Sequence, residues 1–141
     1  MKIRVGFVSN SSSTSFVIIG HSGILEIPSS NNERICVSGL YEFGWSGCTR
    51  HTNGRIAFAW MQAQYQKRDD WVTMIKQTVK AVTGLELVCL VDPFADYCVS
   101  SYSYIDHQSI GESNEIFSST DELKAFLFDK ESYIKMGNDN E

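Results

Sequence analysis

One segment near the middle of the chain constrains the fold more than any other. From Trp71 to Val82, apolar side chains recur about every 3.6 residues, which is the repeat of a helix that buries one face. Asp69 or Asp70 can cap this helix, and Gly84 can end it because glycine readily adopts the left-handed conformation found after a last helical turn. We therefore expect a helix here that packs against another layer of structure.

Candidate strands supply that layer. The segment LELVCLVD follows the helix directly, is apolar at most positions and ends at Pro93, so it has the pattern of a strand in the middle of a sheet. Residues 3–8 and 16–19 are predicted to pair as a hairpin. Shorter or less regular strand patterns occupy residues 23–27, 34–37 and 97–106.

Two more helices are expected in the chain. Asn53 can cap a helix that begins near Gly54, and its outward side chains would be Gln62, Gln66 and Lys67. Ser119 and Glu122 have the spacing of a capping box, in which two side chains satisfy backbone N–H groups at a helix start. This spacing predicts a short helix over residues 121–130, whose inward face would contain Leu123, Phe126 and Leu127.

The elements together predict an α+β fold. We expect a single domain over residues 1–141, with a mixed, mostly antiparallel sheet and two to three helices packed on it. A chain of 141 residues, of which 43% are apolar, can bury one sizeable core. Residues 39–54 combine glycines with aromatic residues and should form an irregular loop, whereas residues 136–141 have the composition of a polar tail.

The charge and the cysteine content of the chain indicate which classes of protein it resembles least and in which compartment it is expected. The formal charge of −5, from 17 acidic and 12 basic residues, lacks the positive footprint of a nucleic-acid-binding protein. No apolar run approaches the roughly 18 to 20 residues that span a bilayer, and no secretion signal is recognised, so we expect a cytoplasmic protein. Its cysteines should then stay reduced, most of them as small core residues: Cys36, Cys48, Cys89 and Cys98.

A polar stretch near the start of the chain is the first candidate site. Its residues carry hydroxyl or amide side chains: Ser9, Asn10, Ser11, Ser12, Ser13, Thr14 and Ser15. Together with backbone N–H groups they could surround a phosphate, although the glycine and lysine of a P-loop are missing. The same side chains also satisfy backbone groups in turns, and we favour a tight loop between two strands without bound phosphate.

Two pairs of reactive side chains are further candidates. His107 could act as a general base oriented by Asp106 or Glu112 if the strand has ended before them, although a polar strand exit explains the pair more simply. Cys48 and His51 have a C-x-x-H spacing, which offers two zinc ligands or a nucleophile and its base. Two ligands are too few for a structural zinc site, so we predict neither a metal nor a cofactor.

Three short segments carry a resemblance to known proteins. The opening GFVSNSSSTSF, the segment YIDHQS and the ending SYIKMGNDN resemble a group of small proteins of tailed bacteriophages and some bacteria. These proteins begin with a serine-rich segment of the GFVSNSSSSSF type, from which this chain departs only at Thr14. The resemblance implies a phage-type accessory protein and implies no particular reaction.

Two functions of different class stay open at this point. In the first, the chain is a non-enzymatic module that binds a host or virion protein through an aromatic surface of Tyr41, Phe43 and Trp45. In the alternative, it binds or acts on a phosphate-bearing small molecule through the hydroxyl stretch, with Asp106 and His107 transferring protons. We favour the first, because the second needs positive charge near the phosphate that the sequence supplies sparsely.

Overall fold

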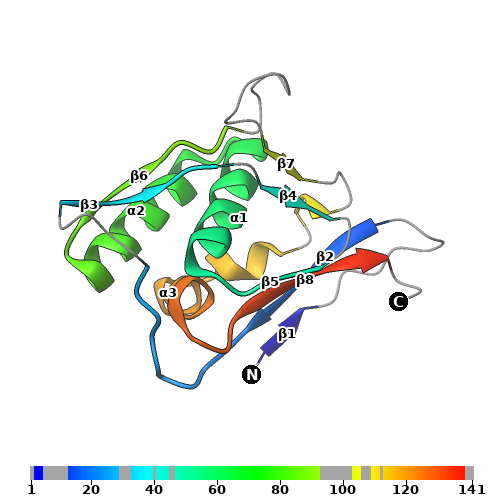
Figure 1. The fold of residues 1–141 in the computed structure, drawn as a ribbon, viewed down its shortest axis with the longest axis horizontal. Coiled ribbons are helices and arrows are strands. Elements are labelled where there is room, and N and C mark those ends of the chain that lie inside the picture. The colour runs from blue at the N-terminus through cyan, green and yellow to red at the C-terminus, as the bar shows by residue number, and fades with distance from the viewer. Residues whose placement is uncertain are drawn as a thin grey trace.

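Helix α1, Thr52–Tyr65, lies at the centre of the fold, between a pair of short strands and the largest sheet (Figure 1). The structure is a computed structural model that describes residues 2–4, 13–28, 33–39, 41–44, 47–92, 103–105, 109–111 and 113–138. Helix α2, Asp69–Thr83, packs on α1 and on α3, Thr120–Phe128, which also contacts the largest sheet. A short 3₁₀ helix, Asn114–Phe117, precedes α3.

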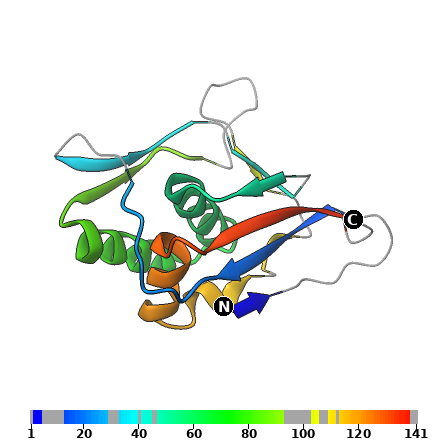
Figure 2. The same ribbon diagram turned by 60° about the horizontal axis from the view of Figure 1, so that its bottom comes forward.

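The largest sheet has four strands in the order β1-β2-β8-β5, each antiparallel to its neighbours (Figure 2). Their bounds are Lys2–Arg4 for β1, Ser13–Ile19 for β2, Tyr133–Asn138 for β8 and Gly47–Thr49 for β5. The antiparallel pairing of β1 with β2, in which Lys2 lies opposite Ile19, confirms the predicted hairpin. Strand β2 begins three residues earlier than expected, so part of the hydroxyl stretch belongs to it.

Strand β8 occupies an inner position in this sheet, although its last residues were assigned to a polar tail from the sequence. Met136 pairs with Ser15 of β2 on one side and with Gly47 of β5 on the other. Ile134 and Met136 are buried while Lys135 between them is exposed, as expected of a strand with one face on the core. Pairing with two distant segments, rather than local composition, therefore decides the structure of this part of the chain.

Two short parallel pairs complete the strands. Strand β3, Arg34–Val37, pairs with β6, Glu86–Cys89, and β4, Glu42–Phe43, pairs with β7, Tyr104–Ile105. The expectation that β6 lies in the middle of a sheet is not met among the described residues, where it pairs only with β3 and Leu90 beyond it is 54% exposed. The strand expected at residues 23–27 is also absent from this described segment, which forms a single bridge between Leu25 and Asp129.

Helix α1 is buried on nearly all sides, which differs from the outward polar face predicted for it. Gln62 is fully buried, where its Nε2 donates to the carbonyl of Ser109 (2.7 Å) and its Oε1 accepts from the N–H of Gly111 (3.0 Å). The helix starts with His51 at the N-cap, so the expected cap Asn53 lies inside the first turn. Hydrogen bonds from a distant turn thus allow a polar side chain in the core.

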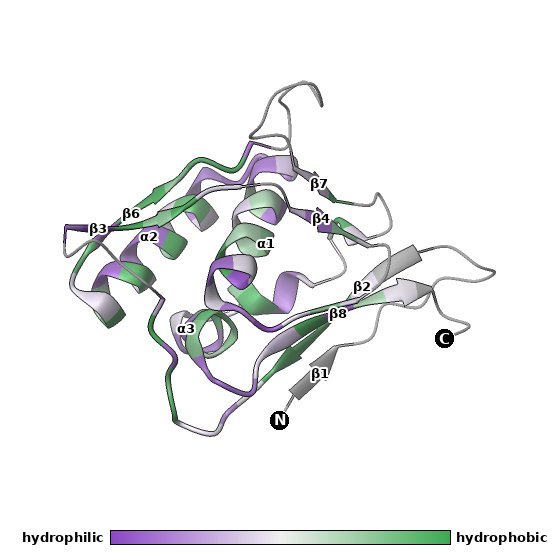
Figure 3. Ribbon diagram, in the orientation of Figure 1, coloured by the Kyte–Doolittle hydropathy of each residue, from purple (hydrophilic) through white to green (hydrophobic). Residues whose placement is uncertain are grey.

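The other two helices confirm their predicted positions. Helix α2 buries Trp71, Ile75 and Val79, and its ribbon alternates between hydrophobic and hydrophilic residues (Figure 3). Gly84 ends it at φ 75°, the left-handed conformation expected of this glycine, whereas Arg68 and not an aspartate is its N-cap. In α3 the capping serine is confirmed, because Ser119 Oγ accepts a hydrogen bond from the N–H three residues later (3.1 Å).

These elements form the single α+β domain that the sequence predicts, with mixed sheets and three α-helices around one core. The cysteines differ from expectation. Cys36 and Cys48 are exposed and Cys89 is half-buried, and all three are free thiols. The prediction that most cysteines are core residues is therefore wrong for Cys36 and Cys48, and Cys98 lies outside the described residues.

Candidate functional site

A cleft with a volume of about 540 Å³ opens beside the N-terminal end of α1. Three segments that are distant in the sequence form its walls: residues 26–28, Tyr41, and residues 48–54. The last of these segments contains the end of β5, the turn through Arg50 and His51, and the first residues of α1. The site is thus built on a strand, a turn and a helix, which hold its side chains in fixed positions.

The turn from β5 into α1 is tight because of a glycine. Gly54 lies so close to Thr49 that a Cβ atom at position 54 would overlap the Thr49 Cγ2 methyl group. Tyr41 also approaches this glycine, since the same Cβ atom would lie 4.0 Å from Tyr41 Cε1. Glycine at this position therefore allows the strand, the helix and the tyrosine ring to meet at the floor of the cleft.

The opposite wall, residues 26–28, is fastened to two helices. The N–H of Glu26 donates to the carbonyl of Phe128 at the end of α3 (2.7 Å), and Thr52 Oγ1 donates to the carbonyl of Glu26 (3.2 Å). Ile27 projects from this wall with 54% of its surface exposed. The cleft consequently has one exposed apolar side chain on a wall that the backbone holds in place.

A buried arginine of α1 links this helix to the end of α3 and to Glu26 in the cleft wall. Arg55 is fully buried, and its Nη1 donates to the carbonyls of Phe126 (3.2 Å) and Asp129 (2.5 Å). Its Nη2 lies 3.7 Å from Glu26 Oε1. Burial lowers the pKa of Arg55 to about 10, although Glu26 and Asp129 act to raise it, so the guanidinium stays charged at neutral pH.

Strand β5 forms one edge of the four-stranded sheet (Figure 1). Its last two residues, Cys48 and Thr49, line the cleft. Among the described residues β5 pairs only with β8, so its second edge has no partner strand there. Cys48 and Thr49 both line the cleft, although adjacent residues on a strand point to opposite faces. A cavity that touches both residues therefore lies beside the backbone of the strand rather than over one face.

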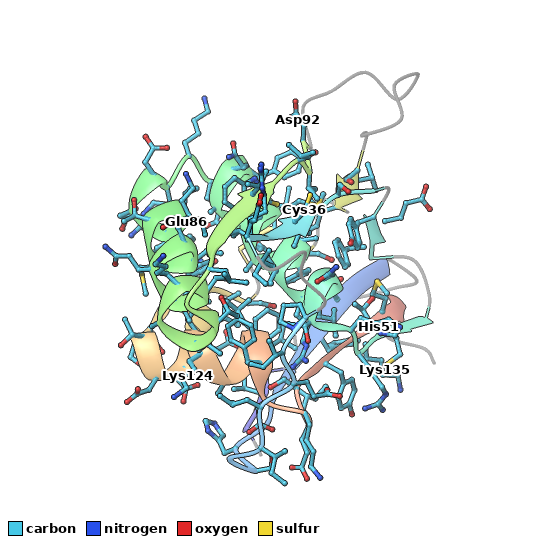
Figure 4. The ribbon with its side chains drawn as sticks, turned by 60° about the vertical axis from the view of Figure 1, so that its left-hand side comes forward. Cys36, His51, Glu86, Asp92, Lys124 and Lys135 are labelled. Carbon is cyan, nitrogen blue, oxygen red and sulfur yellow. The ribbon has the colours of Figure 1, made fainter. Side chains whose placement is uncertain are left out.

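The outer face of the sheet beside this edge carries positive charge. Cys48 is the cross-strand partner of Lys135, and both side chains are exposed. Arg50 follows on the same face and places its guanidinium 4.1 Å from the centre of the Tyr133 ring, a cation–π contact. Figure 4 shows His51 and Lys135 on the same side of the molecule. This corner is basic in a chain whose formal charge is −5.

The residues proposed as an aromatic contact surface differ in their exposure. Tyr41 lines the cleft and is half-buried, with its ring stacked 6.1 Å from that of Phe43. Phe43 itself is buried at 1% exposure, so its assignment as a contact residue is wrong. It packs edge-on against Phe58 of α1, and this core position could not be distinguished by sequence from a surface one. Trp45 lies outside the described residues.

The hydroxyl stretch and the acid–histidine pair are described only in part. Residues 9–12, Asp106, His107 and Glu112 lie outside the described residues, whereas Ser13, Thr14 and Ser15 belong to β2 and not to a loop. Ser15 is buried and accepts a hydrogen bond from Ser109 Oγ (3.1 Å). Its hydroxyl therefore joins two parts of the core, whereas the prediction for the stretch was a tight loop held by side-chain to backbone hydrogen bonds.

Cys48 and His51 both line the cleft. Within the part of the chain that the structure describes, no three His, Cys, Asp or Glu side chains are placed to share a metal ion. Lys135 is a residue of this site that was not predicted from the sequence. The signal that could have found Lys135 is the alternation of apolar and polar residues from Tyr133 onward, which is typical of a strand.

Comparisons with protein-family models, with curated proteins and with solved structures found no significant match to this chain. None of the helices among the described residues has the length and apolar content that crossing a membrane requires.

Proposed function

We propose that this chain is a protein-binding module that takes up an extended segment of a partner protein along the free edge of β5. The proposal is based on the cleft, which lies beside the edge of β5 that has no partner strand among the described residues. An edge strand presents N–H and C=O groups that can pair with another strand, and strand addition is a common mode of peptide recognition. The cleft adds room for the side chains of the incoming segment.

The walls of the cleft support this mode of binding. Tyr41, Ile27 and Pro28 present apolar surface to the cleft, which a partner side chain can cover. The hydrogen bonds of Glu26 and Thr52 hold the wall across from β5 in place before any partner arrives. Such preorganisation lowers the entropy cost of binding, so even a short segment can be held.

The resemblance of parts of the sequence to small phage proteins suggests which kind of protein this module is and which kind of partner it binds. The module would be an accessory protein of phage type, and its partner a host or virion protein in the cytoplasm of the host cell. The alternative, a phosphate-bearing ligand held by the hydroxyl stretch, has no favouring observation among the described residues. Ser15, the one hydroxyl of that stretch whose surroundings are described, is buried and hydrogen-bonded to Ser109.

The proposal is tested with peptides selected from a random library on the full chain. Titration into the ¹⁵N-labelled chain should shift the amide signals of residues 26–28 and 47–54. Each selected peptide is then prepared with N-methyl groups on alternate backbone amides, in both registers. Strand addition requires that methylation in one register abolishes binding, because those amides face β5, while the other register leaves binding intact.

Two results would contradict the proposal. In the first, no peptide is selected, or the shifts fall on α2 and on the β3–β6 pair and leave β5 unchanged. In the second, both N-methylated forms bind as well as the unmodified peptide, which would show that the backbone edge is not used.

A further inference from the structure

We propose that the partner segment alternates acidic and apolar side chains, with the acidic ones beside Arg50 and Lys135 and the apolar ones in the cleft. This inference rests on the proposed function, because it concerns a strand added to the edge of β5. It follows from what the two faces of the sheet would present to that strand.

A strand added to β5 continues the pleat of the sheet. Its successive side chains point alternately to the outer and the inner face, in step with Cys48 and Thr49. Outward side chains would lie about 4.5 to 5.5 Å from the residue opposite them on β5. The side chains on each face of the sheet therefore determine which kind of residue is favoured at every second position of the partner segment.

The outer face of the sheet carries two cationic side chains within reach of the outward side chains of an added strand. Arg50 lies two residues beyond Cys48 and on the same face, and its stacking on Tyr133 leaves the in-plane N–H groups able to bind a carboxylate. Lys135 is one strand further away, about 10 Å from the added strand, given a spacing of about 4.8 Å between strands. The side chains of lysine and glutamate together span that distance, so outward carboxylates match this face.

The inner side offers apolar surface. Thr49 points inward against Gly54, and Tyr41 approaches the same glycine, so this ring lies on the inner side of the added strand. The exposed Ile27 lines the same cleft. Glu26 is the acidic group of the cleft wall, and its carboxylate lies 3.7 Å from the Arg55 guanidinium, which offsets its charge. Apolar side chains are therefore favoured over acidic ones on this side.

A second copy of this chain fits the edge less well. If β5 of one molecule paired with β5 of another, the basic groups Arg50 and Lys135 of both copies would lie on one continuous face. Repulsion between these like charges disfavours the pairing of two copies of the chain. The charge pattern thus selects an acidic partner of a different sequence.

The test compares peptides of about eight residues, a usual strand length. One alternates Glu and Val, a second has the same composition with the four Glu residues first, and a third alternates Lys and Val. We expect the alternating Glu–Val peptide to bind and to shift residues 47–54, and the other two to bind at least about fivefold more weakly. Raising the ionic strength to about 1 M, where charges are screened within about 3 Å, should remove most of that preference.

Variants of the full chain test whether Arg50 and Lys135 cause the preference for the alternating Glu–Val peptide. Arg50→Glu and Lys135→Glu should each weaken binding of the alternating Glu–Val peptide about fivefold or more, and strengthen binding of the Lys–Val peptide. Arg34→Glu is the matched control, since Arg34 is an exposed arginine on the distant strand β3 and its reversal changes the net charge equally. It should leave both affinities unchanged.

The outcomes separate this inference from the proposed function. Binding along β5 that does not depend on alternation, on acidic residues or on Arg50 would overturn the inference and leave strand addition standing. A dimer that forms through β5, with Cys48 of two copies cross-linked by oxidation, would also overturn it. If no peptide binds along β5, both proposals are wrong.

Discussion

Gly54, in the first turn of α1, lies directly against the side chain of Thr49 at the end of β5. The contact is close enough that any side chain at position 54 would overlap the threonine methyl group. The turn that connects strand to helix and forms the floor of the cleft therefore depends on a residue without Cβ.

Gly54→Ala should lower the free energy of unfolding. Overlap in a packed region costs about 1 to 3 kcal/mol, while the better helix propensity of alanine returns about 1 kcal/mol. Thr49→Ser removes the overlapping methyl group, so the double variant should be at least as stable as Thr49→Ser alone. Urea denaturation of the four proteins measures this coupling. A Gly54→Ala variant more stable than the wild type would show that the contact is not tight.

Arg55→Met should destabilise the domain by about 2 to 5 kcal/mol, because it removes the guanidinium donor from two buried carbonyl groups and leaves Glu26 without its cationic partner. The Phe126 carbonyl loses this donor outright, whereas the Asp129 carbonyl keeps the N–H of Ser132 (3.0 Å). Arg55→Lys should recover little of the loss, since an ammonium group lacks the planar fork of donors. Thermal and urea unfolding provide the measurement. Arg34→Met on the exposed face of β3 serves as control and should change stability little.

Because of Asp129, the free energy of unfolding should decrease as the pH is lowered into the acid range. Its burial acts to raise the pKa, but hydrogen bonds from the N–H of Glu131, from Ser22 Oγ and from the N–H of Gly23 outweigh it, so the pKa of this carboxyl is lowered. A lowered pKa in the folded state means that the folded state binds fewer protons than the unfolded state. The stability from Asp129 is present above the ordinary carboxyl pKa of about 4 and is lost as pH falls below it.

Comparison with Asp129→Asn isolates this contribution. Chemical denaturation of both proteins between about pH 6 and pH 2.5 should show a smaller loss of stability for the variant, which is less stable at neutral pH. Parallel curves for the two proteins would show that other carboxyl groups cause the acid sensitivity.

The thiols should fall into fast and slow classes. Cys36 and Cys48 are exposed, whereas burial raises the pKa of the Cys89 thiol to about 12, so few Cys89 thiolates exist near pH 8. A disulfide reagent added to the folded Cys98→Ser variant should modify two thiols quickly and the third only after unfolding. Three equally fast thiols, or fewer than three in urea, would contradict the structure.

The sequence by itself determined the elements whose signals are local. Helix α2 has one apolar stripe and a glycine stop, and α3 has a capping serine three residues before its glutamate. The hairpin of β1 and β2 joins two segments separated by a short polar stretch. In each case neighbouring residues report both the conformation and the buried face, because hydrophobic periodicity and capping act within a few residues.

Only the tertiary structure decided where the remaining elements lie. Gln62 is buried because a turn near Ser109 supplies its hydrogen-bond partners, and β8 is a strand because β2 and β5 pair with both its edges. The same holds for the candidate site, whose walls come from residues 26–28, 41 and 48–54. Contacts between distant segments satisfy polar groups and cover apolar ones, and no local pattern encodes which segments will meet. The exposed position of Cys48 beside Lys135 follows from that pairing and from nothing in the neighbouring sequence.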